Sequence, residues 1–469
     1  MKNEATVQIE CSPEIAEKLI PLLNLVNNPQ TSSTAEEIEK QEKALLKQVN
    51  ELAGLILQQQ IQSSIDSQEV KEVENQILQS LPHKMINKGK VVVKLRTSTG
   101  LDIIVWVCYF ARKEKRWSKR KRNPGIYPGL CALGIYERCT PALAAEVALY
   151  AGMLGSLEEA KQVLAERGIE LNYKVVRIIA YQFAERARLA QQMKTMDFGS
   201  GVAGRKVVIS ADGGRIRLRE NKRGKKTTKG GNRYRGEWRE PKLFIIYVVD
   251  EEGKMERSFL PIIDALIRGP DEMFELLYTY LSQISLTEAD EILFIADGAT
   301  WIWNRIPDLV KRLKLAPDQV HELIDFYHAV EHLGTVASQK KSWTAKQRKT
   351  WIKKHRKLLK EGHIDKVISA IKAICLGPSR RAIKTQMNYF IKNTSRMAYN
   401  RLRAIKMPIG SGSVESAIRR VVNLRLKGPC IFWLKESAEA ILLLRSYWKA
   451  GRWNMLKNMA NTFVHESFS

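Results

Sequence analysis

The sequence predicts a multidomain α/β protein, with a mixed sheet, a large helical insertion and a mainly helical N-terminal region. A chain of 469 residues is too long for one typical core. Apolar residues recur at helical spacing through the first 85 residues, whereas apolar runs typical of buried strands lie between 206 and 296. A long helical and basic stretch follows them. We therefore expect five regions, at residues 1–90, 91–200, 201–327, 328–405 and 406–469.

The first region is rich in Glu, Gln, Lys and Leu. Segments 35–61 and 68–81 carry apolar residues at helical spacing, which predicts one or two amphipathic helices. These helices either form a coiled coil with a second copy or pack on their own domain. Segment 91–110 alternates like a β-hairpin with its turn near residues 98–100.

A basic run with Trp117 inside it follows the hairpin. Its cations are Arg112, Lys113, Lys115, Arg116, Lys119, Arg120, Lys121 and Arg122. Such a run is either a solvated loop or a loop that contacts phosphates.

Segment 140–190 is expected to form three helices. Thr140-Pro141 starts the first, a capping box at 156–159 starts the second, and Gly168 ends it before a third begins near Asn172. Two short helices and a longer one that carries Lys174, Arg177 and Arg186 fit a helix-turn-helix that reads DNA. A plain helical packing module fits the same pattern.

Two aspartates each follow an apolar strand. The strand at 206–211 ends on Asp212, the strand at 243–249 comes next, and the strand at 292–296 ends on Asp297. Glu415 lies on the first turn of a helix that begins after Gly410-Ser411-Gly412-Ser413, whose glycines we expect to allow a sharp turn. The predicted elements begin with a three-strand meander and continue with alternating helices and strands. A helical insertion then precedes the closing helix, and this is the order of the ribonuclease H-like fold.

These three carboxylates suit a metal-dependent phosphodiester reaction. Open α/β sheets bind ligands at strand ends, and hard oxygen donors favour Mg²⁺ or Mn²⁺ over Zn²⁺. Two such ions can activate a water or a 3′-hydroxyl and stabilise the leaving oxygen. A single strand-end Asp is commonly only a turn former, but the combination of Asp212, Asp297 and Glu415 predicts catalytic metal ligands for two ions.

Residues 200–450 resemble the DDE transposases of bacterial insertion sequences, of the ISKra type. The matching segments are Ser210-Ala211-Asp212-Gly213-Gly214-Arg215, Ala296-Asp297-Gly298-Ala299-Thr300-Trp301-Ile302-Trp303 and Gly410-Ser411-Gly412-Ser413-Val414-Glu415-Ser416. The resemblance implies that Asp212, Asp297 and Glu415 form the metal-binding triad, with a helical insertion between Asp297 and Glu415. Asp325-Phe326-Tyr327-His328 is similar to a further signature of related transposases, so Asp325 and His328 are possible accessory residues.

Several basic and aromatic residues near the triad are candidates for DNA contact. Trp301 and Trp303 either stack on a base or pack under the next helix. On the helix of Glu415, Arg419 and Arg420 are expected to follow the DNA strand, with Arg425 and Lys427 beyond them. A glycine-rich insertion at 220–240, beside Asp212, is either a clamp on the DNA backbone or an exposed loop without a fixed role. Its cations are Lys222, Arg223, Lys225, Lys226, Lys229, Arg233, Arg235 and Arg239.

The overall charge agrees with a polyanionic partner. Lys and Arg total 77 against 50 acidic residues, a formal net charge of +27, which favours nucleic acid over an acidic membrane surface. No apolar run predicts a membrane span, and the N-terminus has no signal core, so a bacterial cytoplasmic, nucleoid-associated protein is expected. The six cysteines include no CxxC pair, which indicates reduced thiols rather than a zinc ribbon.

The expected function is a DNA transposase that cuts element ends and joins their 3′-hydroxyls to target DNA, as a homodimer or larger synaptic complex. The alternatives are a ribonuclease H-like nuclease that hydrolyses without joining and a domesticated DNA-binding protein with an inactive site. The three acids argue against the inactive protein, and the chain length and helical insertion argue against a simple nuclease.

Overall fold

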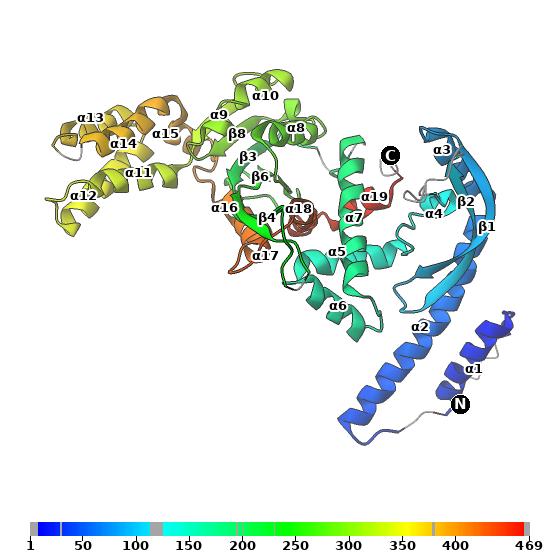
Figure 1. Ribbon diagram of the computed structural model, residues 1–469. Coiled ribbons are helices and arrows are strands. Elements are labelled where there is room, and N and C mark those ends of the chain that lie inside the picture. The colour runs from blue at the N-terminus through cyan, green and yellow to red at the C-terminus, as the bar shows by residue number, and fades with distance from the viewer. Residues whose placement is uncertain are drawn as a thin grey trace, which may run out of the picture. The chain divides into compact units, whose positions relative to one another are not determined.

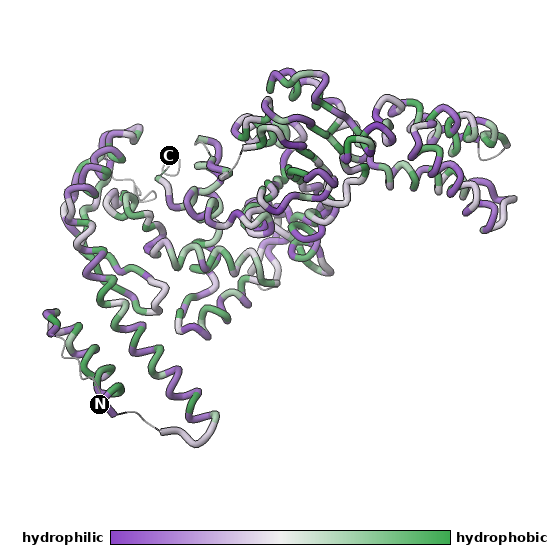
Figure 2. Tube along the Cα trace, turned by 180° about the vertical axis from the view of Figure 1, so that it is seen from behind, coloured by the Kyte–Doolittle hydropathy of each residue, from purple (hydrophilic) through white to green (hydrophobic). Residues whose placement is uncertain are grey.

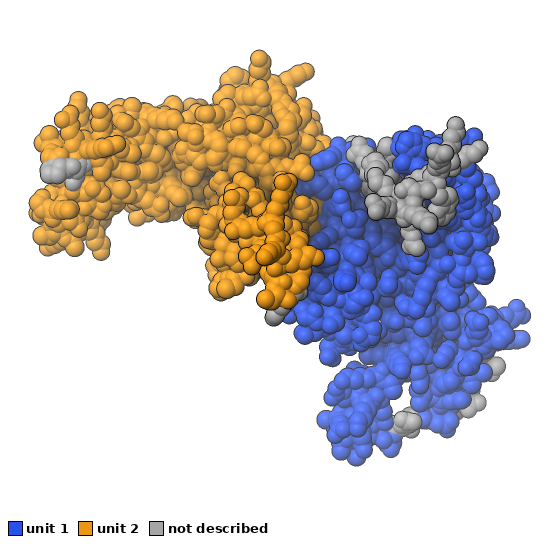
Figure 3. Space-filling view, in the orientation of Figure 1, with its two compact units in different colours: residues 1–193, 456–469 blue, residues 194–455 orange. Residues whose placement is uncertain are grey.

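The computed structural model describes residues 8–28, 31–112, 125–193, 196–199, 201–228, 230–377 and 380–463. The chain forms two compact units (Figure 3): residues 1–193 with 456–469 form unit 1, and residues 194–455 form unit 2. Most of the basic run at 112–122, from Lys113 onward and including Trp117, lies outside the described residues.

Unit 1 is mainly helical with one β-hairpin (Figure 1). Its elements are α1 (Pro13–Asn27), α2 (Ala35–Asp66), α3 (Gln68–Ser80), β1 (Met85–Arg96), β2 (Asp102–Arg112), α4 (Pro128–Ala132), α5 (Pro141–Met153), α6 (Leu157–Glu166), α7 (Tyr173–Met193) and most of α19 (Trp453–Asn461). The two expected amphipathic helices are confirmed as α2 and α3. The hairpin is also confirmed, and it is longer at both ends than the pattern predicted.

The hairpin has one buried face, because alternate residues of β1 and β2 point to the same side. Val93, Leu95, Ile103 and Val105 are buried there against α2 and α4. The turn is closed by the Thr97 hydroxyl, which donates to the Leu101 carbonyl at 2.7 Å. Unit 1 therefore has its own hydrophobic core.

Helices α5, α6 and α7 form the three-helix module that the sequence predicts. Ser156 accepts from the amide of Glu159 at 3.0 Å, while the Glu159 carboxylate accepts from the amide of Gly155, one residue before the expected partner. Gly168 has a φ of 76°, which ends α6. Asn172 caps α7 by accepting from the amide of Val175 at 3.0 Å.

Arg186 on α7 does not face solvent, which corrects its place among the DNA-contacting cations. Its side chain is buried, lies 2.5 Å from the Glu137 carboxylate and donates to the Ala460 carbonyl at 3.0 Å. The guanidinium also lies over the Tyr136 ring, 4.2 Å from its centroid. Helical periodicity did not distinguish this inward arginine from the exposed Lys174 and Arg177.

Unit 2 is an α/β unit built on a mixed five-stranded sheet. Its strands are β3 (Lys206–Gly213), β4 (Ile216–Asn221), β5 (Tyr234–Arg239), β6 (Lys242–Val249), β7 (Ile262–Leu266), β8 (Glu291–Ala296) and β9 (Val320–Ile324). Its helices are α8 (Pro270–Leu281), η1 (Leu286–Glu288), α9 (Thr300–Trp303), α10 (Ile306–Arg312), α11 (Phe326–Ser338), α12 (Ala345–Lys360), α13 (Ile364–Ile374), α14 (Arg380–Lys392), η2 (Thr394–Arg396), α15 (Tyr399–Ala404), α16 (Gly412–Ile418), the π-helical turn η3 (Arg419–Asn423), α17 (Leu424–Leu426) and α18 (Lys435–Lys449).

The sheet has the strand order β7-β6-β3-β8-β9. Strands β3, β6 and β7 form an antiparallel meander, and β3, β8 and β9 run parallel. Every residue of β6 is buried, as expected for a strand covered on both faces, and α8, α16 and α18 pack against these strands. Strands β4 and β5 form a separate two-stranded hairpin.

Residues 328–405 are helical, as the sequence predicts. The described part of this insertion consists of α11–α15 and η2, and none of it adds a strand to the central sheet. Helix α12 carries an exposed basic face that includes Lys346, Lys349, Lys353, Lys354, Arg356 and Lys357. The insertion is therefore a helical subdomain with a basic surface.

No helix within the described ranges combines the length and the apolar character that a membrane span requires.

The burial of Arg186 makes a stability prediction. Arg186→Met should destabilise unit 1 by roughly 3 kcal/mol, because it removes the buried guanidinium and leaves the largely buried Glu137 without its cation. Arg177→Met, on the exposed face of the same helix, should stay within about 0.5 kcal/mol of the parent. Urea unfolding followed by circular dichroism measures both, and equal effects of the two substitutions would contradict the structural role of Arg186.

Candidate active site

Three carboxylates lie at the ends of three neighbouring parallel strands, Asp212 within the last two residues of β3 and the other two directly after β8 and β9. Ser210 on β3 pairs with Ile295 on β8, so Asp212 and Asp297 each lie two residues farther along adjacent strands. The Ser210 hydroxyl donates to the Ile295 carbonyl at 2.7 Å and fixes this register. Asp325 directly follows β9, and its amide donates to the Ala296 carbonyl at 2.8 Å. The parallel strands therefore bring these aspartates to one edge of the sheet.

Asp325 links the two helices that frame this edge. Its side chain is fully buried and accepts from the amide of His328 at 2.8 Å, which caps α11. Its other oxygen accepts from the amide of Ser411, directly before α16. This geometry gives Asp325 a structural role and places Glu415, on the first turn of α16, at the same edge.

Glu415 is exposed and points toward α11. Its side-chain oxygen accepts a long hydrogen bond from the Ser411 hydroxyl at 3.4 Å and lies 4.0 Å from Nε2 of His328. Nδ1 of His328 lies 3.3 Å from the carboxylate of Glu331, one turn along α11. His328 thus lies between two acids at the rim of the site.

The electrostatics of Asp212 connect the three acids. Burial raises the pKa of Asp212 to about 6, and the negative charges of Asp297 and Glu415 act in the same direction. The Gly213 amide, which donates to Asp212 at 2.6 Å, and His328 oppose the rise. A carboxylate that is costly to ionise beside two others is a good place for a cation.

The donor set fits Mg²⁺ or Mn²⁺, because all three groups are carboxylates at one sheet edge. No three His, Cys, Asp or Glu side chains in the described ranges are already close enough together to form a metal-binding group. What favours a cation is the register that places Asp212 and Asp297 at one sheet edge, and the raised pKa of Asp212 agrees with it.

Trp303 does not present a stacking surface. Its ring is buried, its Nε1 donates to the Asp297 carbonyl at 2.6 Å, and the Arg396 guanidinium lies 4.7 Å from its ring centroid. The alternative of packing under the helix is correct for Trp303, which fixes the turn that carries Asp297. Trp301 is half-buried, with Nζ of Lys242 5.1 Å from its ring centroid.

Tyr389 on α14 is a site neighbour that the sequence did not indicate. Its ring leaves no room for a side chain at Gly298, where a Cβ atom would lie 2.5 Å from it. It stacks on His332 of α11 with ring centroids 3.6 Å apart. Its hydroxyl is buried without a hydrogen-bond partner within the described ranges. Burial raises the pKa of Tyr389 above its usual range, and Asp297 and Asp325 add to this.

The glycine before α16 is required by space rather than by a left-handed turn. Gly410 is not among the residues with positive φ, so the chain does not use the left-handed region at this position. A Cβ atom at Gly410 would lie 2.6 Å from the ring of Tyr327. The glycines of two matching segments, at 298 and 410, thus accommodate tyrosine rings from the helical insertion.

The basic insertion at 220–240 is the hairpin of β4 and β5. The Arg215 and Arg217 guanidinium groups lie 4.7 and 5.4 Å from the Trp238 ring centroid. The base of the hairpin is anchored by the segment after α17, because the amide of Arg219 donates to the Trp433 carbonyl at 2.8 Å. Trp433 is itself buried.

The cations of this hairpin differ in their freedom to bind a new anion. Arg235 and Arg239 pair with Glu220, at 2.9 and 3.7 Å, so part of their charge is already compensated. Lys229 lies outside the described residues. The other candidates are exposed and form no ion pair in the described part of unit 2, and they are Lys222, Arg223, Lys225, Lys226 and Arg233.

The cations that follow Glu415 also separate into two groups. Arg419 is exposed and Arg420 is half-buried. Arg425 is buried, with its guanidinium 4.9 Å from the Trp433 ring centroid. This corrects the expectation that it extends toward the DNA strand. The buried Arg445 on α18 donates to the backbone carbonyls of Arg420 and Val421 in the π-helical turn η3.

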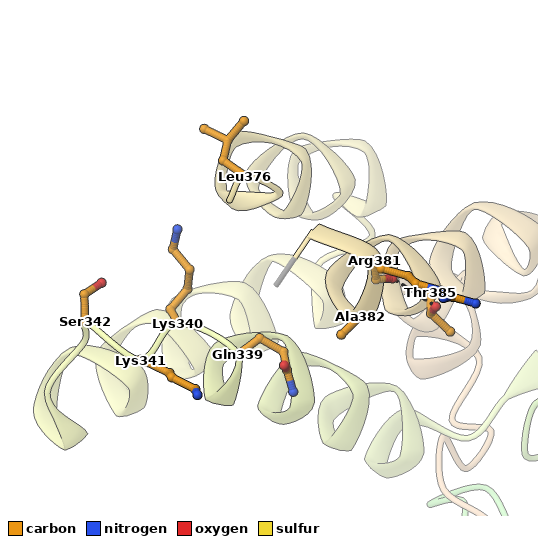
Figure 4. A pocket seen from close by; sticks show the side chains of 8 residues that line it. All are labelled: Gln339, Lys340, Lys341, Ser342, Leu376, Arg381, Ala382 and Thr385. Carbon is orange, nitrogen blue, oxygen red and sulfur yellow. Dashed lines mark hydrogen bonds between the residues drawn. The ribbon is translucent and has the colours of Figure 1, made fainter. Parts of the chain in front are cut away.

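A basic hollow lies in the helical insertion (Figure 4). Its volume is about 830 Å³, and Lys340, Lys341 and Arg381 line it together with Ser342 and Thr385. Helix α11 begins beside the acidic edge and ends at this hollow, and its 13 residues span about 20 Å. The hollow is thus distinct from the acidic edge and has the opposite charge.

Comparisons of the chain with models of protein families, with curated proteins and with solved structures gave no match.

The raised pKa of Asp212 makes a prediction for metal-free protein in the presence of a chelator. The pKa of Asp212 is about 6 in the folded protein against an ordinary value of 3.8, so the folded state holds the proton more tightly. The stability that this proton contributes is complete below pH 3.8 and is lost as the pH rises through 6. At pH 7.5 the ionised carboxylate should therefore cost on the order of 1–3 kcal/mol. Asp212→Asn should melt at a higher temperature than the parent at pH 7.5, and the difference should vanish near pH 4.

The control is Asp318→Asn, which changes an exposed aspartate of the same unit. Its melting temperature should follow that of the parent across this pH range. A stabilisation by Asp212→Asn that does not depend on pH would refute the electrostatic account of Asp212.

Proposed function

We propose that the chain is a DDE transposase that cuts phosphodiester bonds at element ends and joins the 3′-hydroxyls to target DNA. The observation that carries the proposal is the shared sheet edge of Asp212, Asp297 and Glu415, where burial raises the pKa of Asp212 and the two other acids act in the same direction. The partners under this proposal are double-stranded DNA, as element ends and target, and a second copy of the chain. The cofactor is Mg²⁺ or Mn²⁺, with two ions.

The topology supports a ribonuclease H-like core. Such a core has an antiparallel three-strand meander followed by two parallel strands on the other side of its first strand. The order β7-β6-β3-β8-β9 has this arrangement. The first acid lies on the first strand, the second follows the fourth strand, and the third lies on the closing helix, 118 residues after the second (297 to 415).

In this mechanism Asp212, Asp297 and Glu415 hold the cations, which supply Lewis-acid stabilisation of the phosphodiester oxygens when bound. Asp325 positions Glu415, because its buried carboxylate ties Ser411 to the first turn of α11. Trp303 positions Asp297 through its hydrogen bond to the Asp297 carbonyl. These buried contacts fix the acids before DNA binds, so little reorganisation is needed in the transition state.

The DNA backbone would be held by basic surfaces on both sides of the acids. The β4–β5 hairpin continues from β3 after a two-residue link, Gly214 and Arg215, and presents exposed lysines and arginines. On the other side, α12 and the hollow at the end of α11 present further cations. Phosphate contacts of this kind position DNA without reading its sequence.

The first prediction separates chemistry from binding. Asp212→Asn keeps the size of the side chain but removes one negative charge from the cation site, so cleavage and joining in Mg²⁺ should fall by roughly a thousandfold or more. DNA affinity should hold or rise slightly, because a repulsion is removed. Purified protein is incubated with element ends and target plasmid, and nicking and joining are read separately on gels.

Each outcome of that assay decides between functions. Full strand transfer by Asp212→Asn would refute the mechanism. Cleavage without joining by the parent protein would favour a nuclease, and DNA binding without either reaction would favour a domesticated binding protein. Asp318→Asn is the control, because it removes the same charge from an exposed position.

The second prediction tests the hairpin. Changing Lys225, Lys226 and Arg233 together to alanine should weaken DNA binding by one to two orders of magnitude and flatten its salt dependence. The catalytic step on saturating DNA should change much less. Fluorescence anisotropy across a salt series measures the binding slope.

The matched control for this triple variant changes Lys40, Lys43 and Lys47 on α2 to alanine. It removes the same three positive charges from the acidic N-terminal region. If both triple variants flattened the salt dependence equally, the effect would reflect net charge alone, and the hairpin would not be the clamp.

A further inference from the structure

Helix α2 carries an apolar stripe on its exposed side. Ile38, Leu45, Val49 and Ile56 are between 40% and 56% exposed, although each is a large aliphatic residue. At 100° per residue these four positions fall within about 40° of one another around the helix axis. The stripe is therefore a continuous line about 27 Å long, rather than a set of scattered surface residues.

The spacing of the stripe is that of a coiled coil. The steps from Ile38 to Leu45, Val49, Leu52 and Ile56 are seven, four, three and four residues, so the apolar residues occupy the a and d positions of successive heptads. Between residues 38 and 56, Glu42 is the only charged residue that lies within about 80° of the centre line of the stripe, measured around the helix axis. A second helix can lie along this line with little electrostatic cost.

Helix α1 does not cover the stripe, although it packs on α2. The Ser12 hydroxyl accepts from Gln59 at 3.1 Å and Lys18 pairs with Glu51 at 2.9 Å, so the two helices run antiparallel. Three further large aliphatic residues of α1 remain between 48% and 77% exposed, and they are Ile20, Leu23 and Val26. Figure 2 shows the alternation of hydrophobic and hydrophilic positions along both helices.

The exposed apolar area suits a protein partner. The aliphatic side chains of α1 and α2 together expose on the order of 700 Å², close to the roughly 800 Å² that each partner buries in a standard interface. The α2 stripe is a continuous line of exposed aliphatic residues, which marks an interaction surface rather than scattered surface residues.

The charge of this segment argues against DNA as the occupant. Residues 8–66 contain nine acidic and four basic residues, a net charge of −5, in a chain with a net charge of +27. DNA would be repelled here, whereas a partner that lies along uncharged heptad positions would not. A second copy of α2 has the matching heptads and the matching uncharged flanks.

We propose that two copies of this chain associate through the exposed apolar face of α1 and α2, with the α2 stripes in contact as a coiled coil. The interface is independent of the acidic edge of unit 2 and of DNA. Its failure would therefore leave the proposed function intact, and failure of the proposed function would leave the interface intact.

The experiment measures the mass of the full-length protein without DNA by sedimentation equilibrium, from nanomolar to high micromolar concentration. The parent should have about twice the chain mass of 53.6 kDa. Leu45→Glu with Val49→Glu should raise the dissociation constant of the dimer at least roughly 100-fold, because two charges enter the centre of the apolar contact.

The matched control is Ala44→Glu with Lys47→Gln, which makes the chain more negative by the same two charges. Both positions are exposed and lie about 120° and 180° around the helix from the stripe. This variant should dimerise like the parent. Circular dichroism of both variants reports whether α2 still folds.

A second measurement needs no variant. Hydrogen exchange of peptides that cover residues 38–56 should slow as the concentration of the parent protein crosses the dissociation constant. A parent that stays monomeric would overturn the proposal, as would a Leu45→Glu, Val49→Glu protein that dimerises like the parent. A stripe that the chain itself covers would give slow exchange at every concentration, which also overturns it.

Discussion

The buried carboxylate of Asp325 is the contact on which the arrangement of the acidic edge depends. It accepts hydrogen bonds from the first turn of α11 and from the residue before α16, so one side chain joins the helical insertion to the helix of Glu415. A buried carboxylate is stable only when backbone N–H groups or cations satisfy it. This requirement holds the two helix starts together across the insertion that separates them in sequence.

The tyrosines of the insertion use the space that two glycines leave. Tyr389 lies on Gly298, directly after Asp297, and Tyr327 lies on Gly410, just before α16. The segments that carry Asp297 and Glu415 are therefore each in contact with an aromatic ring from the inserted helices. A larger residue at either glycine would displace that ring, so the insertion acts as a wall of the site as well as a basic surface.

The sequence predicts the strands, the helical insertion and the placement of Asp212 and Asp297 at adjacent strand ends. It does so because burial gives strands and helices distinct apolar periods. The pattern did not distinguish cations that face inward. Arg186 and Arg425 look like surface cations in sequence, yet one binds Glu137 and the other lies against Trp433. Their partners are 49 and 8 residues away (137 to 186, 425 to 433), and local periodicity carries no information on such pairings. For the same reason Tyr389 was not foreseen, since its contact with Gly298 exists only after the insertion folds back.

The distribution of charge separates two kinds of surface along the chain. The segment with the exposed heptad stripe is acidic, whereas the hairpin beside Asp212 and the outer face of α12 are basic. At physiological ionic strength, exposed charges more than about 8 Å apart are largely screened from each other. The charge of each surface therefore acts mainly on the molecule in direct contact with that surface. An acidic, apolar helix repels DNA but accepts a protein helix, and a basic hairpin attracts DNA. The two proposed partners, a second copy of the chain and a polyanion, therefore suit surfaces of opposite charge.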